Sequence, residues 1–399
     1  MQASAQSLIA TPPQLPTPLP QVAQEDLTNN VMNVFIPSGV VNNSDLPQWL
    51  QYGPFNLRPH VDASISYGDG IQSQPGHSVT SAVWAFSPGL TVDLGKHWTL
   101  DYTPTFRYYS SSAMRDEVDH SLSLSGQTHY EDWSLGLSQT FVESSSPIAQ
   151  TGTQTDQQHY GTDLTASRLL NDDFSADFGL SQKINTTGGL QNSRDWSTMD
   201  WLNYQIWPRL NVGIGGGGGF TDLDVGSDQT YEDVQARINW RATDKISFQV
   251  SGGGEDRQFM TGNQSALFNP IFSGSIQYLP AKNTQISLTG SRSVGASDYY
   301  IISQVTETTS VAANLNQRMF KKYRVNLGAS YTKTENTVAI SVISQNRTDE
   351  YVSYSASISR DFLRHGTWSI FYQYNDNRSS LAGYSVHGGQ VGTSISYRF

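Results

Sequence analysis

The charged residues that could do chemistry in this chain differ between its two halves. In the first half, aspartates alternate with apolar residues in extended-looking segments, and in the second half arginines do so. Because successive side chains of a strand point to opposite faces, these charges are expected on the polar faces of strands, where they can attract or repel ions. The set is Asp62, Asp93, Asp101, Asp119, Asp163 and Asp177, followed by Arg237, Arg241, Arg318, Arg324 and Arg398.

Signals for catalysis or for a bound cofactor are weak in this sequence. The histidines are scattered, and no two of them have metal-ligand spacing on one strand or helix. The run Gly215 to Gly219 lacks the Lys-Ser or Lys-Thr of a phosphate loop, so it predicts a bend or a close approach of backbone within a strand. We find no outward serine on a strand next to that of His120. The sequence predicts neither an enzyme nor a cofactor or metal site.

The element that must position the charges is a repeated strand. In the last segment, Val391, Thr393, Ile395, Tyr397 and Phe399 fall on one face, and the chain ends on Phe399. Similar alternation recurs from Leu57 onward in about eighteen segments. Polar residues fill the alternate positions. This pattern predicts an all-β fold, a transmembrane antiparallel up-and-down β-barrel of about eighteen strands that occupies residues 56 to 399.

Composition agrees with this interpretation. Hydrophobic residues make up 37% of the 399 residues and charged residues 15%, a balance that suits strands with one face in lipid and one in water. The net charge of -11 argues against nucleic acid as a partner. A soluble propeller is the alternative fold, but it would not place aromatic residues near both ends of each strand.

Connections between the segments alternate in length, which indicates topology. Short turns rich in turn formers or charge follow every second segment, as at 95–97, 171–173 and 242–244. Longer links lie between them, at 68–78, 144–157, 256–268, 336–346 and 377–387. Short periplasmic turns and long extracellular loops are typical of outer-membrane barrels. We therefore expect a bacterial outer-membrane location, surrounding lipid, and both termini in the periplasm.

Residues 1 to 55 form a different region, a short irregular N-terminal segment on the periplasmic side. The stretch TPPQLPTPLPQ (11–21) is rich in proline and predicts an extended tether. Two roles are open for this segment, a loose periplasmic tail or a plug that enters the barrel.

Two arrangements of the lumen charges are open as well. In the first, the acidic first half and the basic second half form facing walls with a transverse field across water. In the second, each charge pairs with a neighbour and fills a narrow lumen.

Both ends of the barrel region resemble known families. The last strand resembles the C-terminal signal strand of outer-membrane barrels, which implies that Tyr397 and Phe399 are read by the barrel-assembly machinery. QWLQYGPFNLRPHVDASISYGD (48–69), the strand number and Phe399 together resemble the β-barrel porins of bacterial exopolysaccharide gene clusters. That resemblance implies export of a secreted polysaccharide with a periplasmic export partner. Gly70 departs from the family, which usually has an acidic residue or Asn there.

The residues themselves support a broader class, because sixteen to eighteen strands leave an open lumen. Alternatives to polysaccharide export are a diffusion porin for small polar solutes and a surface adhesion or structural barrel that acts through its loops. Continuous lumen aromatics would favour sliding of a sugar chain, and the candidates are Tyr109, Trp201 and Phe371.

Overall fold

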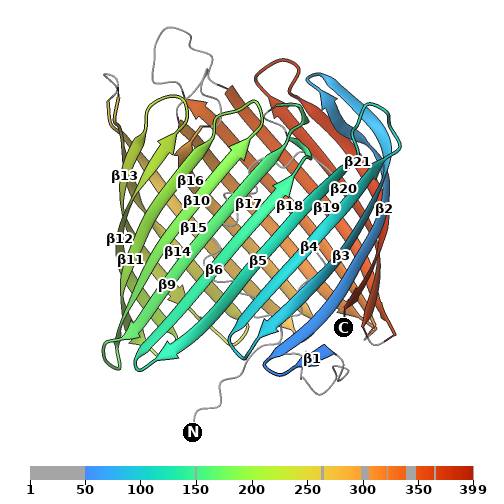
Figure 1. The fold of residues 1–399 in the computed structure, drawn as a ribbon. Helices are drawn as coiled ribbons and strands as arrows, with labels where there is room; N and C mark the ends of the chain where they lie inside the picture. The colour runs from blue at the N-terminus through green and yellow to red at the C-terminus, as the bar shows by residue number, and fades with distance from the viewer. Residues whose placement is uncertain are drawn as a thin grey trace.

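A computed structural model describes residues 50–148, 151–261, 265–297, 305–320, 322–337, 347–363 and 365–398. Within them, long antiparallel strands form one closed barrel of 18 strands, with β2 paired to β21 at the closing seam (Figure 1). The predicted fold class and strand number are confirmed. The barrel strands are β2 (Phe55–Gln74), β3 (His77–Leu94), β4 (Trp98–Tyr109), β5 (Glu117–Tyr130), β6 (Trp133–Ser144), β9 (Gln157–Leu169), β10 (Phe174–Thr187), β11 (Ser193–Trp207), β12 (Leu210–Leu223), β13 (Gln229–Trp240), β14 (Ile246–Phe259), β15 (Leu267–Ala281), β16 (Thr284–Ala296), β17 (Val305–Met319), β18 (Tyr323–Thr337), β19 (Arg347–Phe362), β20 (Gly366–Ser379) and β21 (Val386–Arg398).

The two faces of the sheet differ in polarity because side chains alternate along each strand. On β11, Leu202 and Tyr204 point outward and are 46% and 41% exposed, whereas the alternate residues Trp201 and Asn203 are buried at 8% and 2%. We call the face with the exposed apolar side chains the outer face and the opposite one the inner face. The outer face meets the requirement for contact with lipid, and closure leaves no unpaired strand edge.

Tight turns join alternate pairs of strands at one end of the barrel. They include 95–97 between β3 and β4, 131–132 between β5 and β6, and 208–209 between β11 and β12. Glu131, Phe320 and Leu363 adopt positive φ in such turns, a conformation that tight connections often require. The start of β2 and the end of β21 lie at this same end, which we call the tight-turn end (Figure 1). The opposite end is the loop end.

The strands extend further toward the loop end than their apolar patterns predicted. The predicted link 68–78 is a hairpin instead, in which β2 and β3 are joined by Pro75 and Gly76, with a bulge between Gly68 and Ile71. Likewise β13 begins at Gln229, although its apolar pattern starts only at Val234. The reason is that backbone pairing continues through polar residues, which a search for apolar alternation does not detect.

Most of the predicted N-terminal segment lies outside the described residues, and so does Phe399. Within that segment, β1 (Gln51–Tyr52) pairs with the first residues of β2, so the strand pattern starts at its end. Of the described helices, none has the length and apolar character needed to cross a membrane.

Candidate functional site: the inner wall and the β7–β8 hairpin

Arginine and carboxylate side chains pair along the inner face. Arg58 on β2 forms an ion pair with Asp93 on β3. Arg107 on β4 contacts two carboxylates of β5, Glu117 and Asp119, the latter at 3.1 Å. Each pair joins adjacent strands, so the fields of its two members largely cancel a short distance away.

The second half of the barrel repeats this pairing. Arg237 on β13 reaches Asp177 on β10, and Arg324 on β18 lies 2.5 Å from Asp361 on β19. Two further pairs join residues of one strand, Arg257 with Glu255 at 2.8 Å and Arg347 with Asp349 at 2.7 Å. Contacts between neighbours therefore account for Asp93, Asp119, Asp177, Arg237 and Arg324 of the predicted set.

Other aspartates of the predicted set are held by hydroxyl groups. Asp62 accepts a hydrogen bond from Ser396 across the closing seam. Asp101 accepts hydrogen bonds from Thr91 at 2.6 Å and from Thr103 at 3.0 Å. Asp163 accepts one from Ser181 at 2.8 Å.

The remaining arginines of the predicted set lie at the tight-turn end. Arg318 and Arg398 are near the ends of β17 and β21, and Arg241 follows the last residue of β13. The contacts do not show an acidic wall that faces a basic wall. The first half also holds Arg58 and Arg107, and the second half holds the inner-face acids Asp233, Glu255, Asp349 and Asp361.

Sequence reasoning could have found some of these missed residues. Arg58 and Arg107 occupy inner positions of the same alternation that identified Asp62 and Asp101. Glu255 and Arg257 were missed for a different reason. They lie beyond the apolar part of β14, Arg257 inside the predicted link 256–268 and Glu255 directly before it.

The glycine run of β12 makes room on the inner wall for flat side chains. Trp201 of β11 lies against Gly215, and Arg237 of β13 lies over Gly213. The Arg237 guanidinium carbon is 4.3 Å from the Trp201 ring centroid, a cation-π contact. Bulky side chains of the two neighbouring strands thus lie along the wall, because β12 has no side chains there to displace them.

The predicted lumen aromatics are all used in packing. Trp201 and Phe371 are only 8% and 2% exposed. Tyr109 packs against a small cluster of Ile71, Val83 and Met114, and its hydroxyl donates to Glu117 at 2.9 Å. None of the three offers a ring face on which a sugar chain could slide.

A small hairpin inside the link between β6 and β9 crosses the inner wall. Its strands are β7 (Pro147–Ile148) and β8 (Thr153–Gln154). The hydroxyl of Ser146 bonds to Arg107 at 2.7 Å, and the backbone N–H of Ser145 donates to Asp119 at 3.2 Å. Since Arg107 and Asp119 belong to the inner face, the hairpin is fixed on the inner side of β4 and β5.

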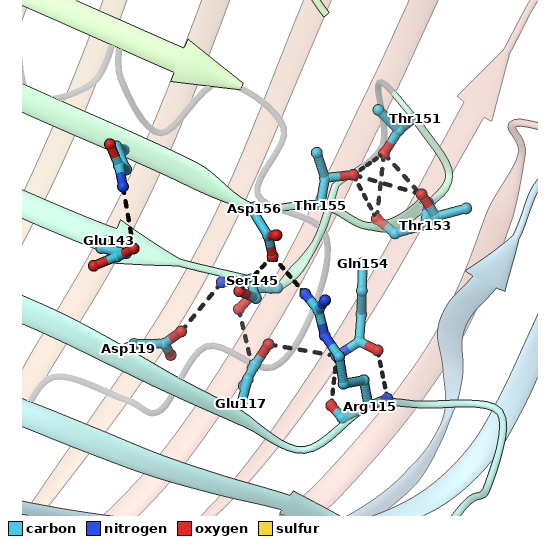
Figure 2. A network of polar contacts seen from close by, with 12 residues as sticks. Arg115, Glu117, Asp119, Glu143, Ser145, Thr151, Thr153, Gln154, Thr155 and Asp156 are labelled. Atoms are coloured by element: carbon cyan, nitrogen blue, oxygen red, sulfur yellow. Dashed lines mark hydrogen bonds and ion pairs between the residues drawn. The ribbon is translucent and has the colours of Figure 1, made fainter. Parts of the chain in front are cut away.

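Figure 2 shows the polar network at the base of this β7–β8 hairpin. Asp156 accepts hydrogen bonds from Arg115 and, at 2.7 Å, from the Ser145 hydroxyl. These two donors hold the pKa of Asp156 below its ordinary value, with Ser145 the larger cause. The side-chain amide of Gln154 forms two hydrogen bonds with the backbone of Arg115. Its oxygen accepts from the Arg115 N–H at 2.6 Å, and its nitrogen donates to the Arg115 carbonyl at 2.8 Å.

The far end of the β7–β8 hairpin reaches β2. A side chain on Gly152 would come within 3.2 Å of Pro75 and 2.9 Å of the Gln72 amide. The hairpin therefore spans from β6, past β5, β4 and β3, to the tip of the β2–β3 hairpin. Such an element covers part of the inner wall near the loop end.

No family model matches the sequence, and no curated protein matches it. In fold, the chain is similar to OccK2 (OpdF) of Pseudomonas aeruginosa, with a TM-score of 0.48, 10% identity, and coverage of 86% of this chain and 98% of that one. OccAB3 of Acinetobacter baumannii gives a TM-score of 0.46 at 10% identity, covering 86% of this chain and 99% of that one. The crystal structure of OccK2 in complex with glucuronate gives 0.47 at 10% identity, covering 86% and 98%.

Histidine and acidic side chains do not form a metal centre in the described ranges, because no group of three or more of them is arranged to hold an ion. Fixed charges, hydroxyls and amides lie along the inner wall.

Proposed function

We propose that this protein is an outer-membrane channel through which small polar solutes diffuse. The observation that carries the proposal is the closed barrel of 18 strands with an apolar outer face and an inner face of ion pairs, hydroxyls and amides. A barrel of this size is wide enough for an aqueous path. The β7–β8 hairpin narrows that path and sets the size of solute that can pass.

In this proposal the tight-turn end faces the periplasm, together with both chain termini, and the loop end faces outward. Residues 1 to 55 form a periplasmic segment, and 56 to 399 form the barrel. The inner-face positions of the predicted Asp and Arg residues make them part of the channel wall.

Polysaccharide export, which the sequence resemblance implies, has less support. A sugar polymer that slides through a pore needs exposed aromatic faces or a continuous ladder of polar groups. Trp201 and Phe371 are buried, and Tyr109 is held by Glu117. The hairpin across the inner wall also suits single small molecules better than a polymer.

The deciding experiment measures permeation directly. Purified protein in planar bilayers should conduct ions, and liposomes that contain it should swell in small sugars faster than in oligosaccharides. A variant without residues 147–154 should pass larger sugars, while its barrel stays folded. Absence of both conductance and swelling would contradict the channel and favour a structural or adhesion barrel.

Deletion in the native organism separates uptake from export. Slower entry of small solutes with normal surface polysaccharide supports the diffusion channel. Loss of surface polysaccharide with ordinary solute uptake would instead support the export function.

A further inference from the structure

Charge on the inner wall is unevenly neutralised. Arg58, Arg107, Arg237, Arg257, Arg324 and Arg347 each have at least one carboxylate within ion-pair distance. Arg107 has two, so that cluster carries an excess negative charge. These arginines therefore contribute little positive potential to the lumen.

Several inner-face carboxylates have no such arginine among the residues that the structure describes. Asp62, Asp101 and Asp163 are held by serine or threonine hydroxyls, which do not cancel their charge. Asp101 also lies 3.9 Å from the Nδ1 atom of His60. The Oδ1 atom of Asp233 has no hydrogen-bond partner at all. These four aspartates come from β2, β4, β9 and β13, so they are spread over the part of the wall from β2 to β13.

Other inner-face cations offset only part of this negative charge along the path. Lys183 on β10 lies opposite Asp195 on β11 and diagonal to Asp163 on β9, so its single charge offsets one of these two carboxylates and leaves the other. Arg241, Arg318 and Arg398 lie at the tight-turn end, away from most of the wall. Fixed charges act on ions within about 10 Å at 0.1 M salt. Arg398 lies within this range of Asp62, because Asp62 pairs with Ser396 two positions away, but the two side chains form no ion pair. Asp163 and Asp233 lie farther along their strands from the tight-turn end.

We propose that the channel selects for cations, and that Asp62, Asp101, Asp163 and Asp233 determine this selectivity. This inference rests on the proposed channel function and names the class of solute that it favours. A small cationic or neutral polar solute meets uncompensated carboxylates along the wall, whereas an anion meets arginines whose charge is already matched.

The test is a reversal-potential measurement in planar bilayers with a KCl gradient. The wild-type protein should be more permeable to K⁺ than to Cl⁻. Replacing the four aspartates by asparagine should lower the permeability ratio by about twofold or more, since each substitution removes one uncompensated charge. Selectivity of the wild type should also weaken between 0.1 M and 1 M salt, because the Debye length falls to about 3 Å.

Asp200→Asn provides the matched control, because it makes the same chemical change on the outer face, and its permeability ratio should equal that of the wild type. If the fourfold variant does not fold, as judged by the heat-dependent shift of the barrel on gels, the single variants D62N, D101N, D163N and D233N replace it, and their shifts should add up.

Three outcomes would each overturn a different part of the proposal. Currents that reverse at zero or on the anion side would overturn the selectivity and leave the channel standing. An equal shift in the Asp200→Asn variant would overturn the assignment to the four aspartates. Complete absence of current at all voltages would overturn the channel function and the selectivity together.

Discussion

Gly70 on β2 and Gly388 on β21 lie against each other across the closing seam, with no room for a side chain on either. A Cβ atom on Gly70 would come 2.5 Å from the Gly388 Cα, and Gly70 also has a positive φ of 75°. The two glycines lie just beyond the last registered pair of the seam, Gly68 with Gln390, and Gly70 lies within the β2–β3 bulge between Gly68 and Ile71. The departure from the exopolysaccharide porin pattern at Gly70 thus has a steric cause within this barrel.

Replacing Gly70 with Asn should weaken barrel closure. Asn tolerates a positive φ, so the penalty comes from the clash with β21 and should be about 1–3 kcal/mol of unfolding free energy. The temperature at which the folded band disappears on a gel measures it. Gly95→Asn is the control, because Gly95 has a φ of 71° and open space around it. Equal stability of the two variants would contradict the steric explanation.

Neighbouring glycines of β12 should respond in opposite ways to the same substitution. Gly215→Val would push into the Trp201 ring, whose Cδ2 atom would lie 2.6 Å from the new Cβ. Gly216→Val points outward, and its Cβ would meet only the Asp233 carbonyl oxygen at 3.8 Å. The first should lose about 1–3 kcal/mol, and the second should be neutral or gain stability from strand propensity and lipid contact. Thermal unfolding of both proteins in the same detergent is the measurement.

The barrel could be read from the sequence because two local signals coincide in it. Period-two alternation locates the lipid-facing part of each strand, and turn residues mark the tight-turn end. Neither signal extends to the loop end, where strands such as β14 continue through Glu255 and Arg257 as an ordinary polar ladder. The β7–β8 hairpin was hidden for a related reason. Its position depends on Asp119, Arg107 and Pro75, which are distant in sequence.

The sequence predicts which charged residues lie on the inner face, but it does not predict which of them form ion pairs. The alternation identifies Asp177 and Arg237 as inward, yet their contact depends on Asn203 and on Gly213 between them. A side chain at position 213 would block the reach of Arg237 from β13 to β10. Pairing across the two intervening strands β11 and β12 is therefore a property of the assembled wall, and no single strand's sequence shows it.

The β7–β8 hairpin should loosen in acid. The pKa of Asp156 is lowered from its ordinary value of 3.8 by the Ser145 hydroxyl and then by Arg115. A lowered carboxyl pKa means that the contact contributes fully above about pH 4 and is lost as the pH falls through the folded-state value. Single-channel currents should be quiet from pH 7 to 5 and should fluctuate at pH 3. Asp156→Asn should fluctuate at every pH, and a pH-independent wild type would contradict this role for the contact.

Phe399 remains a prediction as an assembly signal. The described part of the last strand ends at Arg398, paired with His60, and Tyr397 lies on the outer face beside His365 at 6.1 Å between ring centroids. Deleting Phe399 should reduce the amount of folded protein in the outer membrane without changing its synthesis. Comparison of total and membrane-inserted protein measures the effect, and Phe399→Tyr should retain most of the insertion. Normal insertion of the deletion variant would count against the signal.

Asp200 is an exposed carboxylate on the outer face, at the midpoint of β11 between the aromatic residues Trp196 and Tyr204. Its neighbours across the sheet are Phe178 on β10 and Gly216 on β12, so it projects among groups that suit lipid. The Thr198 hydroxyl donates to it at 3.4 Å, a long contact that provides little compensation. A charge in this position should cost the folded barrel free energy that an apolar side chain would not.

Asp200→Leu should therefore stabilise the barrel in phospholipid vesicles by about 1–2 kcal/mol, since acidic residues on a lipid-facing barrel surface cost less than the roughly 2–4 kcal/mol of basic ones. Urea unfolding from vesicles gives the difference directly. Asp93→Leu is the contrasting variant, because it removes the partner of Arg58 on the inner wall and should lower stability. The gain for Asp200→Leu should shrink in detergent, where water reaches the middle of the barrel more easily than in a bilayer. A loss of stability in vesicles would contradict the lipid-facing position of Asp200. It would mean that the carboxylate makes a favourable contact in the folded barrel, which the leucine side chain cannot make.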